Sequence, residues 1–244
     1  MNKQDVSLGT WLTLYSESIA ELLSKAGYNW ITIDLEHSAI NISQAEKLIR
    51  VIDLAGSKPF VRVSENNSTE IKRVLDAGAR GIIVPMVNSI DDVMNAIAAI
   101  NYPPIGKRGM GLARAQGYGE SSAKKLYIDK KSKEIELYIQ IESIEALSQL
   151  DDIFSQDIDG YMIGPYDLSA SIGIPGDFTN SKFIEIENKI IETAKKYSIK
   201  RGYHVVEPDV SLMKNQINKG YNFIAYSVDF RMLDSSARKP FLDE

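Results

Sequence analysis

Short runs of β-branched and aromatic residues alternate with longer segments of helical periodicity along the whole chain, and this alternation constrains the fold more than any other feature. It is the pattern of repeated βα units around a parallel sheet. Eight such units in 244 residues predict an α/β fold, a single (β/α)8 TIM barrel forming one domain over residues 1–244. Strands are expected near residues 9–14, 30–34, 59–63, 81–85, 136–141, 159–163, 201–206 and 222–226. Helical segments are expected at residues 17–26, 43–54, 68–77, 90–100, 121–132, 144–154, 181–197 and 209–219.

Composition excludes several function classes. Apolar residues make up 44% and charged residues 25%, as in an ordinary globular protein. The net charge of -5 argues against a nucleic-acid partner, which usually requires a basic face. Cysteine is absent, so disulfides, thiolate nucleophiles and zinc–thiolate sites are excluded. No run approaches the roughly 18 apolar residues of a membrane helix, so we expect no membrane association and a cytoplasmic location.

Carboxylates follow two of the apolar runs. Glu142 follows the run that ends at Ile141, and Asp167 comes shortly after the run that ends at Ile163. Parallel strands present their C-terminal ends to one face, so these two side chains could share one divalent cation there. Hard oxygen donors suit Mg²⁺, Mn²⁺ or Co²⁺. The alternative is a buried acid at a strand end that is paired with lysine or arginine.

Two further strand ends carry a base and a cation. His37 follows Asp34-Leu35-Glu36, where a neighbouring carboxylate could orient its ring, and imidazole titrates near neutrality. Arg62 follows Pro59-Phe60-Val61, where a guanidinium could hold a keto oxygen or a developing enolate. A structural histidine and a salt-bridged barrel arginine are the competing interpretations.

Other residues at the strand ends suit substrate binding. Gln140 lies two residues before Glu142 and therefore on the same face of its strand. Gly164, Pro165 and Tyr166 are expected to form a turn before Asp167 whose backbone N–H groups could receive a carboxylate. Trp11 could form the apolar wall beside the substrate, although core packing would explain it equally well.

Two regions leave their roles open. The interval from Asn101 to Tyr127 is rich in glycine and proline and predicts a long βα loop, which either covers the rim, meets another subunit or runs over the surface. Its Arg108 and Arg114 could bind an acidic or polyhydroxylated acceptor, or remain solvated. His204 ends another predicted strand, where it is either structural or in contact with an aldehyde acceptor.

Taken in order, the motifs resemble those of the HpcH/HpaI aldolases over nearly the whole chain, from Gly9-Thr10-Trp11-Leu12 to Val228-Asp229. Several motifs in sequence are more specific than any one alone. They are Asp34-Leu35-Glu36-His37, Val61-Arg62, Val84-Pro85-Met86-Val87, Pro103-Pro104, Gln140-Ile141-Glu142 and Gly164-Pro165-x-Asp167-Leu168-Ser169.

The resemblance implies a class II aldolase that reversibly cleaves a 4-hydroxy-2-oxo acid into pyruvate and an aldehyde through a metal-bound pyruvate enolate. It assigns the divalent cation to Glu142 and Asp167, and the general base to His37. Asp34, at the start of the same motif, is expected among the catalytic residues. Arg62 would stabilise the enolate. No lysine stands at an apolar strand end, which disfavours Schiff-base chemistry.

The resemblance also implies that Asp76 raises the basicity of the catalytic histidine, across a subunit boundary if need be. A homo-oligomer is expected, with a hexamer the common form. The segments 109–119 and 202–209 depart from the homoprotocatechuate-pathway enzymes, so a sugar-derived or other polyol aldehyde is a reasonable acceptor. The alternatives are a CoA-thioester lyase of the citrate-lyase β type and a non-catalytic keto-acid-binding protein.

Overall fold

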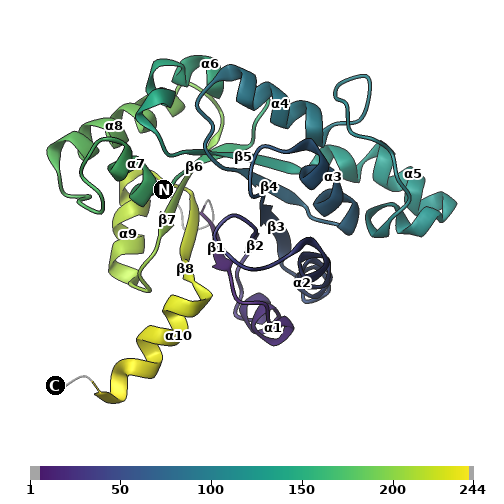
Figure 1. Cartoon of the computed structure of the whole chain (residues 1–244), viewed down its shortest axis with the longest axis horizontal. Coiled ribbons are helices and arrows are strands. Elements are labelled where there is room, and N and C mark those ends of the chain that lie inside the picture. Colours follow the sequence, from purple (N-terminus) through teal and green to yellow (C-terminus); the bar gives the residue numbers. More distant parts are fainter. Residues whose placement is uncertain (1–5, 242–244) are drawn as a thin grey trace.

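A computed structural model describes residues 6–241, in which eight parallel strands close into a barrel (Figure 1). Each strand pairs with its neighbours in sequence, and β8 returns to pair with β1. The predicted (β/α)8 barrel is therefore confirmed. The strands are β1 (Ser7–Leu12), β2 (Trp30–Asp34), β3 (Lys58–Arg62), β4 (Gly81–Val84), β5 (Glu136–Ile141), β6 (Gly160–Ile163), β7 (Lys200–Val205) and β8 (Phe223–Val228).

Helices surround the barrel, and the last one, α10, projects away from it at the C-terminal end of the described chain (Figure 1). The α-helices are α1 (Glu17–Lys25), α2 (Ile42–Leu54), α3 (Ser68–Ala77), α4 (Ile90–Ile100), α5 (Ser121–Asp129), α6 (Leu150–Phe154), α7 (Pro165–Ser171), α8 (Ser181–Ala194), α9 (Val210–Lys219) and α10 (Asp229–Arg238). Shorter 3-10 segments lie at Arg114–Gly119, Lys131–Glu134, Ile144–Ser148 and Lys239–Phe241.

The predicted elements match the observed ones closely, with three differences. All eight strands begin and end within two residues of the prediction. The segment 144–154 is a 3-10 turn followed by α6, instead of one helix. Helices α7 and α10 were not expected, because the first was interpreted as a turn and the second lies beyond the last predicted strand.

Large aromatic rings fill the barrel interior near the starts of the strands, and glycines opposite them leave the necessary space. Trp30, Phe60, Tyr138 and Phe223 stack there, with ring centroids as close as 3.9 Å for Tyr138 and Phe223. A Cβ on Gly9 would overlap the Trp30 indole. A Cβ on Gly81 would likewise overlap the Phe60 ring. Glycines and large aromatic rings therefore pack against one another in the barrel interior.

An ion pair network closes the N-terminal end of the barrel. Glu136 is 9% exposed and accepts from Lys58 Nζ at 2.5 Å and Lys200 Nζ at 3.0 Å. Tyr138 Oη donates to the same carboxylate at 3.0 Å. The two lysines hold the pKa of Glu136 below its usual value although burial acts in the opposite direction. Charged side chains therefore occupy the N-terminal end of the barrel.

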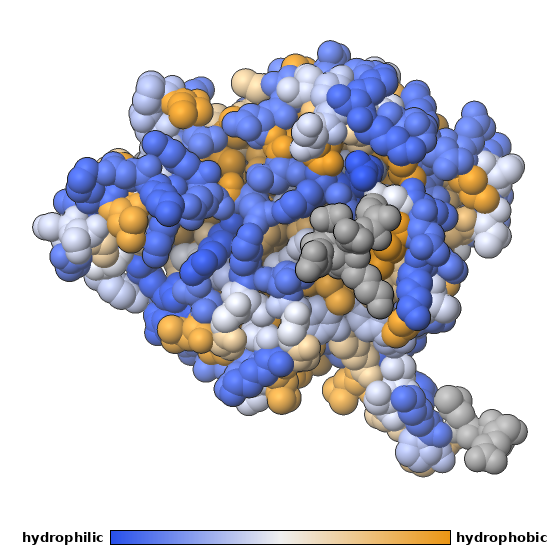
Figure 2. Space-filling view, turned by 180° about the vertical axis from the view of Figure 1, so that it is seen from behind, coloured by the Kyte–Doolittle hydropathy of each residue, from blue (hydrophilic) through white to orange (hydrophobic). Residues whose placement is uncertain are grey.

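A second layer of core lies between the strands and the helices, formed by outward-facing strand residues and the inner faces of the helices. The face seen in Figure 2 is mainly hydrophilic with scattered apolar spots, and α10 stands clear of the body. Within residues 6–241, none of the helices combines the length and apolarity that crossing a membrane requires.

We expect Gly9→Ala to destabilise the protein by about 1–3 kcal/mol, the usual cost of overpacking a filled core. The added methyl group would overlap the Trp30 indole. Urea denaturation of the single variant and of the Gly9→Ala/Trp30→Phe double variant measures this. The smaller ring should recover part of the loss. Equal unfolding midpoints for Gly9→Ala and the unmodified chain would contradict the packing account.

Candidate active site

The residues predicted to carry chemistry converge at the C-terminal end of the barrel. Asp34 ends β2, Arg62 ends β3 and Gln140 lies one residue before the end of β5, with Glu142 directly after that strand. Parallel strands in a closed barrel bring these ends to one mouth. Trp11 on β1 lies at the same mouth, since its ring contacts the Arg62 guanidinium.

Arg62 is the centre of this cluster and is only 8% exposed. Its Nε donates to Asp34 Oδ1 at 2.9 Å and its Nη2 to Asp34 Oδ2 at 2.7 Å. Its Cζ lies 4.3 Å from the centre of the Trp11 ring. The bidentate pair and the ring fix the plane of the guanidinium, which a lysine ammonium would not allow. Asp34 and the hydrogen bond to it hold the pKa of Arg62 above its ordinary value against the effect of burial.

Glu36 and His37 form the outer edge of the mouth. Glu36 Oε2 lies 2.9 Å from Arg62 Nη1 and 3.7 Å from His37 Nε2. The Glu36 oxygen is buried and has no hydrogen bond of good geometry within residues 6–241. The His37 side chain is 62% exposed, so it can exchange protons with solvent. The acid that lies nearest to the His37 ring is therefore Glu36, while Asp34 accepts from the His37 backbone N–H at 3.3 Å.

Glu142 is 3% exposed and is held from two sides. Gln140 Nε2 donates to its Oε1 at 2.6 Å, which confirms that the two side chains share a face of β5. The backbone N–H of Met86 donates to its Oε2 at 3.0 Å. A Cβ on Gly164 would lie 2.5 Å from Oε1, so only glycine allows β6 to approach this carboxylate.

The segment that follows β6 differs from the predicted turn. Gly164 is the N-cap of helix α7, and Pro165 occupies the first turn, where its missing N–H costs no hydrogen bond. Asp167 lies in the same first turn and is exposed. The N–H of Leu168 bonds back to the Gly164 carbonyl. The expected backbone N–H groups of Tyr166 and Asp167 therefore belong to a helix N-terminus instead of an isolated turn.

The mouth carries an excess of negative charge. Burial raises the pKa of Glu142 to about 7, and the charges of Glu36 and Asp167 contribute in the same direction. Burial also raises the pKa of Glu36, with Arg62 opposing it. Asp34, Glu36 and Glu142 thus lie near the Arg62 guanidinium, and the charge of Asp167 acts on Glu36 and Glu142. The part of the chain that the structure describes has no group of three or more His, Cys, Asp or Glu side chains arranged to hold a metal ion.

His204, whose role the sequence left open, points into the barrel mouth from β7. Its ring centroid lies 5.3 Å from that of Trp11, and its Nε2 is 3.2 Å from the Ser227 carbonyl oxygen. Burial and the Arg62 charge lower the pKa of His204 to about 3, so its ring is neutral. Of the chain's two histidines, one is exposed at the edge and the other is neutral inside.

Asp76, Arg108 and Arg114 lie elsewhere. Arg108 is buried and its Nη2 donates to Asp76 Oδ1 at 2.7 Å, where Gln116 Nε2 also donates at 3.0 Å. Arg114 Nη2 donates to Asp53 Oδ2 at 2.6 Å. These pairs attach the 101–120 segment to α2 and α3, outside the barrel. Within one chain this segment does not cover the rim, and no described hydrogen bond or ion pair joins Asp76 to His37.

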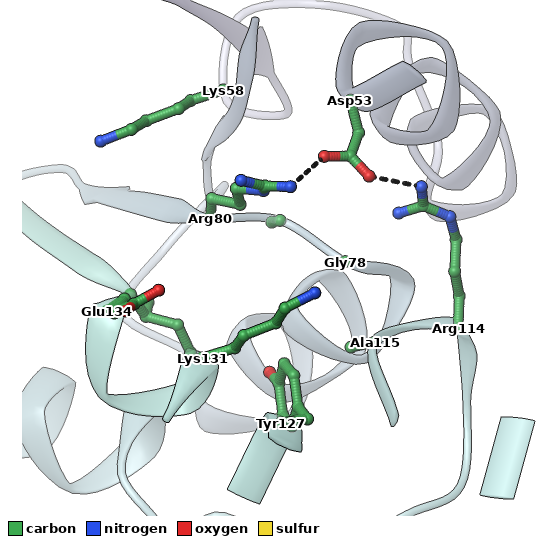
Figure 3. Close-up of a pocket in the computed structure, with 11 residues that line it drawn as sticks. Asp53, Lys58, Gly78, Arg80, Arg114, Ala115, Tyr127, Lys131 and Glu134 are labelled. Carbon is green, nitrogen blue, oxygen red and sulfur yellow. Dashed lines mark hydrogen bonds and ion pairs between the residues drawn. The ribbon is translucent and has the colours of Figure 1, made fainter. Parts of the chain in front are cut away.

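A cavity of about 490 Å³ lies at the opposite end of the barrel, near the starts of β3, β4 and β5. Figure 3 shows Asp53 between the guanidinium groups of Arg80 and Arg114, with Lys131 reaching into the cavity. The ends of α2 and α3 face the same region, where their carbonyl groups favour cations. Arg80 and Arg114 therefore bind near the C-terminal ends of the helices, where Arg114 also attaches the 101–120 segment. They do not lie at the barrel mouth.

Sequence reasoning missed three contributors to the mouth. The Glu36 carboxylate was interpreted only as part of a motif, yet it lies beside Arg62 and His37. The Met86 N–H reaches Glu142 because Met86 has a φ of 51°, which is rare for a non-glycine residue. Ser227, with a φ of 56°, supplies the carbonyl that holds His204. No pattern in the amino-acid sequence indicates a positive φ at a methionine or a serine.

The model of the HpcH/HpaI aldolase/citrate lyase family matches residues 7–235. The chain belongs to this family. A hydroxypyruvate/pyruvate aldolase from Sagittula stellata is 36% identical over 94% of the chain and 90% of its own length. A 2-keto-3-deoxy-L-rhamnonate aldolase from Klebsiella pneumoniae is also 36% identical, over 92% of the chain and 84% of its own length. These relatives confirm the predicted resemblance and the predicted enzyme class, an aldolase.

A solved structure of a family member shows the same architecture. An HpcH/HpaI aldolase/citrate lyase family protein from Burkholderia cenocepacia superposes with a TM-score of 0.91 at 28% identity, covering 98% of this chain and 95% of that one. This chain therefore shares its barrel fold with that family member.

The raised pKa of Glu142 predicts a stability that depends on pH in metal-free protein. A carboxyl whose folded pKa lies above its unfolded value favours folding most below about pH 4.5, and that contribution is lost as the pH rises toward about 7. We expect unfolding midpoints in urea, with EDTA present, to fall from pH 5 to pH 8 more steeply in the unmodified chain than in Glu142→Gln. Parallel pH profiles would show that Glu142 is not the group responsible.

Proposed function

We propose that this chain is a class II pyruvate aldolase, which reversibly cleaves a 4-hydroxy-2-oxo acid into pyruvate and an aldehyde. The observation that carries this proposal is the buried Arg62 guanidinium, fixed by Asp34 at the mouth and surrounded by carboxylates. A fixed guanidinium at such a place stabilises negative charge that develops on a keto oxygen. The relatives named as aldolases support the same reaction.

The proposed bond changes need one base and one site for negative charge. The 4-hydroxyl loses its proton, the C3–C4 bond breaks and the aldehyde carbonyl forms at C4. The electrons of that bond move into the enolate of pyruvate, whose C3 then takes up a proton. His37 would accept and return the proton, with Glu36 orienting its ring 3.7 Å away. Arg62 would face the enolate oxygen.

The donor set at the mouth fits a divalent cation. Glu142 and Asp167 provide hard oxygen ligands, and the buried Glu36 oxygen lacks a hydrogen bond within residues 6–241. Each Glu142 oxygen keeps a free lone pair beside the single hydrogen bond it accepts. Mg²⁺, Mn²⁺ or Co²⁺ held there would act as a Lewis acid toward the keto acid. The cation would also offset the negative charge of Glu36, Glu142 and Asp167, which act on one another at the mouth.

Substrate contacts are proposed for the remaining residues of the mouth. Gln140 would contact the keto acid beside Arg62, from which its Oε1 lies 3.4 Å. The first turn of α7 at Gly164, Pro165, Tyr166 and Asp167 would receive the carboxylate through backbone N–H groups, with Pro165 contributing none. Trp11 would form the apolar wall. Lys58 and Lys200 are paired at the closed end, which disfavours a Schiff base.

Self-association is a further part of the proposal. Helix α10 leaves the barrel with Phe230, Leu233 and Phe241 exposed, an unusual number of large apolar groups for a free helix and its end. A homo-oligomer, with a hexamer expected from the resemblance, would cover them. Asp76 would reach a histidine only from a neighbouring subunit. We also propose, from the sequence, that residues 1–244 form a single domain and that the protein is cytoplasmic.

We expect the chain to release pyruvate from 4-hydroxy-2-oxo acids only when a divalent cation is present. The experiment strips the protein with EDTA, restores Mg²⁺, Mn²⁺ or Co²⁺, and follows pyruvate in the unmodified chain, His37→Ala and Glu142→Ala. His37→Ala should lose at least about 100-fold in kcat, as is usual when an acid–base group is removed. Glu142→Ala should lose activity because it removes a ligand of the cation. Loss of metal affinity should accompany Glu142→Ala alone.

Arg114→Ala is the matched control, because that arginine pairs with Asp53 outside the barrel mouth. Full activity in His37→Ala would contradict the proton-transfer role. Turnover of acyl-CoA thioesters in place of 4-hydroxy-2-oxo acids would favour a citrate-lyase β type of reaction. Binding of keto acids without any turnover would favour a non-catalytic binding protein.

We expect light scattering to give a mass that is a multiple of the 27.2 kDa chain, with six copies from the resemblance. Leu233→Glu should reduce that mass, because a charge on α10 would oppose burial of its apolar face. A monomer at micromolar concentration would contradict the proposed assembly and leave Asp76 without a route to a histidine.

A further inference from the structure

The two histidines of this chain are held in opposite ways, and the inner one has a nitrogen to which no group within residues 6–241 is hydrogen-bonded. His204 Nε2 lies 3.2 Å from the Ser227 carbonyl oxygen, which can only accept. The hydrogen must therefore be on Nε2. With the ring neutral, Nδ1 carries a lone pair and no hydrogen. The tautomer is fixed by the backbone contact and does not depend on a ligand.

Nδ1 opens into the mouth. Within residues 6–241 it has no hydrogen-bond partner, and it is absent from the buried polar atoms that lack one, so solvent reaches it. The His204 ring lies against Trp11, and the Trp11 ring lies against the Arg62 guanidinium. The Trp11 indole nitrogen is itself buried and unpartnered in the same part of the chain. A neutral acceptor thus borders the space in which Arg62 meets the substrate.

The backbone under His204 is built to keep the ring in place. Ser227 is fully buried with a φ of 56°, a strained conformation for serine. Its Oγ donates to the Val206 carbonyl at 2.9 Å, and its own carbonyl also receives Thr10 Oγ1 at 3.4 Å. Three strands therefore fix the carbonyl that fixes the imidazole. A ring needed only for packing would not require this arrangement.

We propose that His204 is a specificity-determining residue whose Nδ1 accepts a hydrogen bond from a hydroxyl group of the substrate. The proposal rests on the aldolase function above. Keto acids and aldehydes offer no N–H donors, so a hydroxyl is the group that can satisfy a neutral nitrogen acceptor there. The hydroxyl belongs either to C3 of the keto acid or to the carbon next to the aldehyde.

Matched substrate pairs separate the two sources. Glycolaldehyde against acetaldehyde, each with pyruvate, tests a hydroxyl on the aldehyde. Hydroxypyruvate against pyruvate, each with acetaldehyde, tests a hydroxyl on the keto acid. For each pair the kcat/KM ratio of hydroxylated to unhydroxylated substrate is compared between the unmodified chain, His204→Phe and His204→Asn. Ratios cancel the intrinsic reactivity of each substrate.

We expect one of the two ratios to fall about tenfold in His204→Phe, the value of one neutral hydrogen bond. His204→Asn, whose amide oxygen can reach the Nδ1 position, should recover part of it. If both ratios stay unchanged while all rates fall equally, His204 is structural and the proposal is wrong. If no pair reacts even in the unmodified chain, the aldolase function fails instead.

Calorimetry gives a readout that does not need turnover. In the presence of Mg²⁺, hydroxypyruvate and pyruvate are titrated into the unmodified chain and His204→Phe. A preference for hydroxypyruvate that disappears in the variant supports the proposal on the keto acid side. Equal preferences in both proteins, together with an unchanged glycolaldehyde-to-acetaldehyde ratio, would overturn it.

Discussion

The arrangement of the barrel mouth depends on the buried ion pair between Asp34 and Arg62. These residues are register partners at the ends of β2 and β3, so the pair forms only when the two strands are aligned correctly. Both hydrogen bonds, at 2.9 and 2.7 Å, use the Nε–Nη2 edge of the guanidinium and leave Nη1 toward Glu36 and Gln140. Burying such a pair costs solvation that its attraction offsets only in good geometry, so stability alone does not explain it. Its effect is to fix a cation where the substrate arrives.

Every second residue of a strand points into the barrel, so the same strands supply side chains to the interior near the strand starts and to the mouth. Inward positions near the strand starts hold Trp30, Phe60, Tyr138 and Phe223, and glycines opposite them leave room. Two residues further toward the mouth, Arg62 and Gln140 are polar, whereas Ile83, Met162 and Ala225 continue the apolar core. The aromatic layer near the strand starts is closely packed, so the backbone that carries the charged side chains of the mouth has little room to shift. This packing helps to hold the charged side chains of the mouth in fixed positions.

The sequence predicted the barrel and most of its strand boundaries because period and strand-end chemistry are local signals. The same local signals placed His37, Arg62, Gln140 and Glu142 at strand ends, and parallel topology brings such ends together. Helix α7 was missed because Gly-Pro marks turns as well as helix starts, and only tertiary context separates them. Arg108 and Arg114 could not be placed from a loop sequence. Their partners, Asp76 and Asp53, lie 32 and 61 residues away.

The two histidines show how environment separates the functions of identical side chains. His37 lies at the exposed edge beside a carboxylate, where a proton can arrive from and leave to solvent. His204 lies beside the Arg62 charge and is tied to a carbonyl, so gaining a proton is unfavourable. A ring that stays neutral can act only as a donor and an acceptor, and its donor is already used. What remains is a single directional acceptor, which suits recognition of a substrate group better than proton transfer.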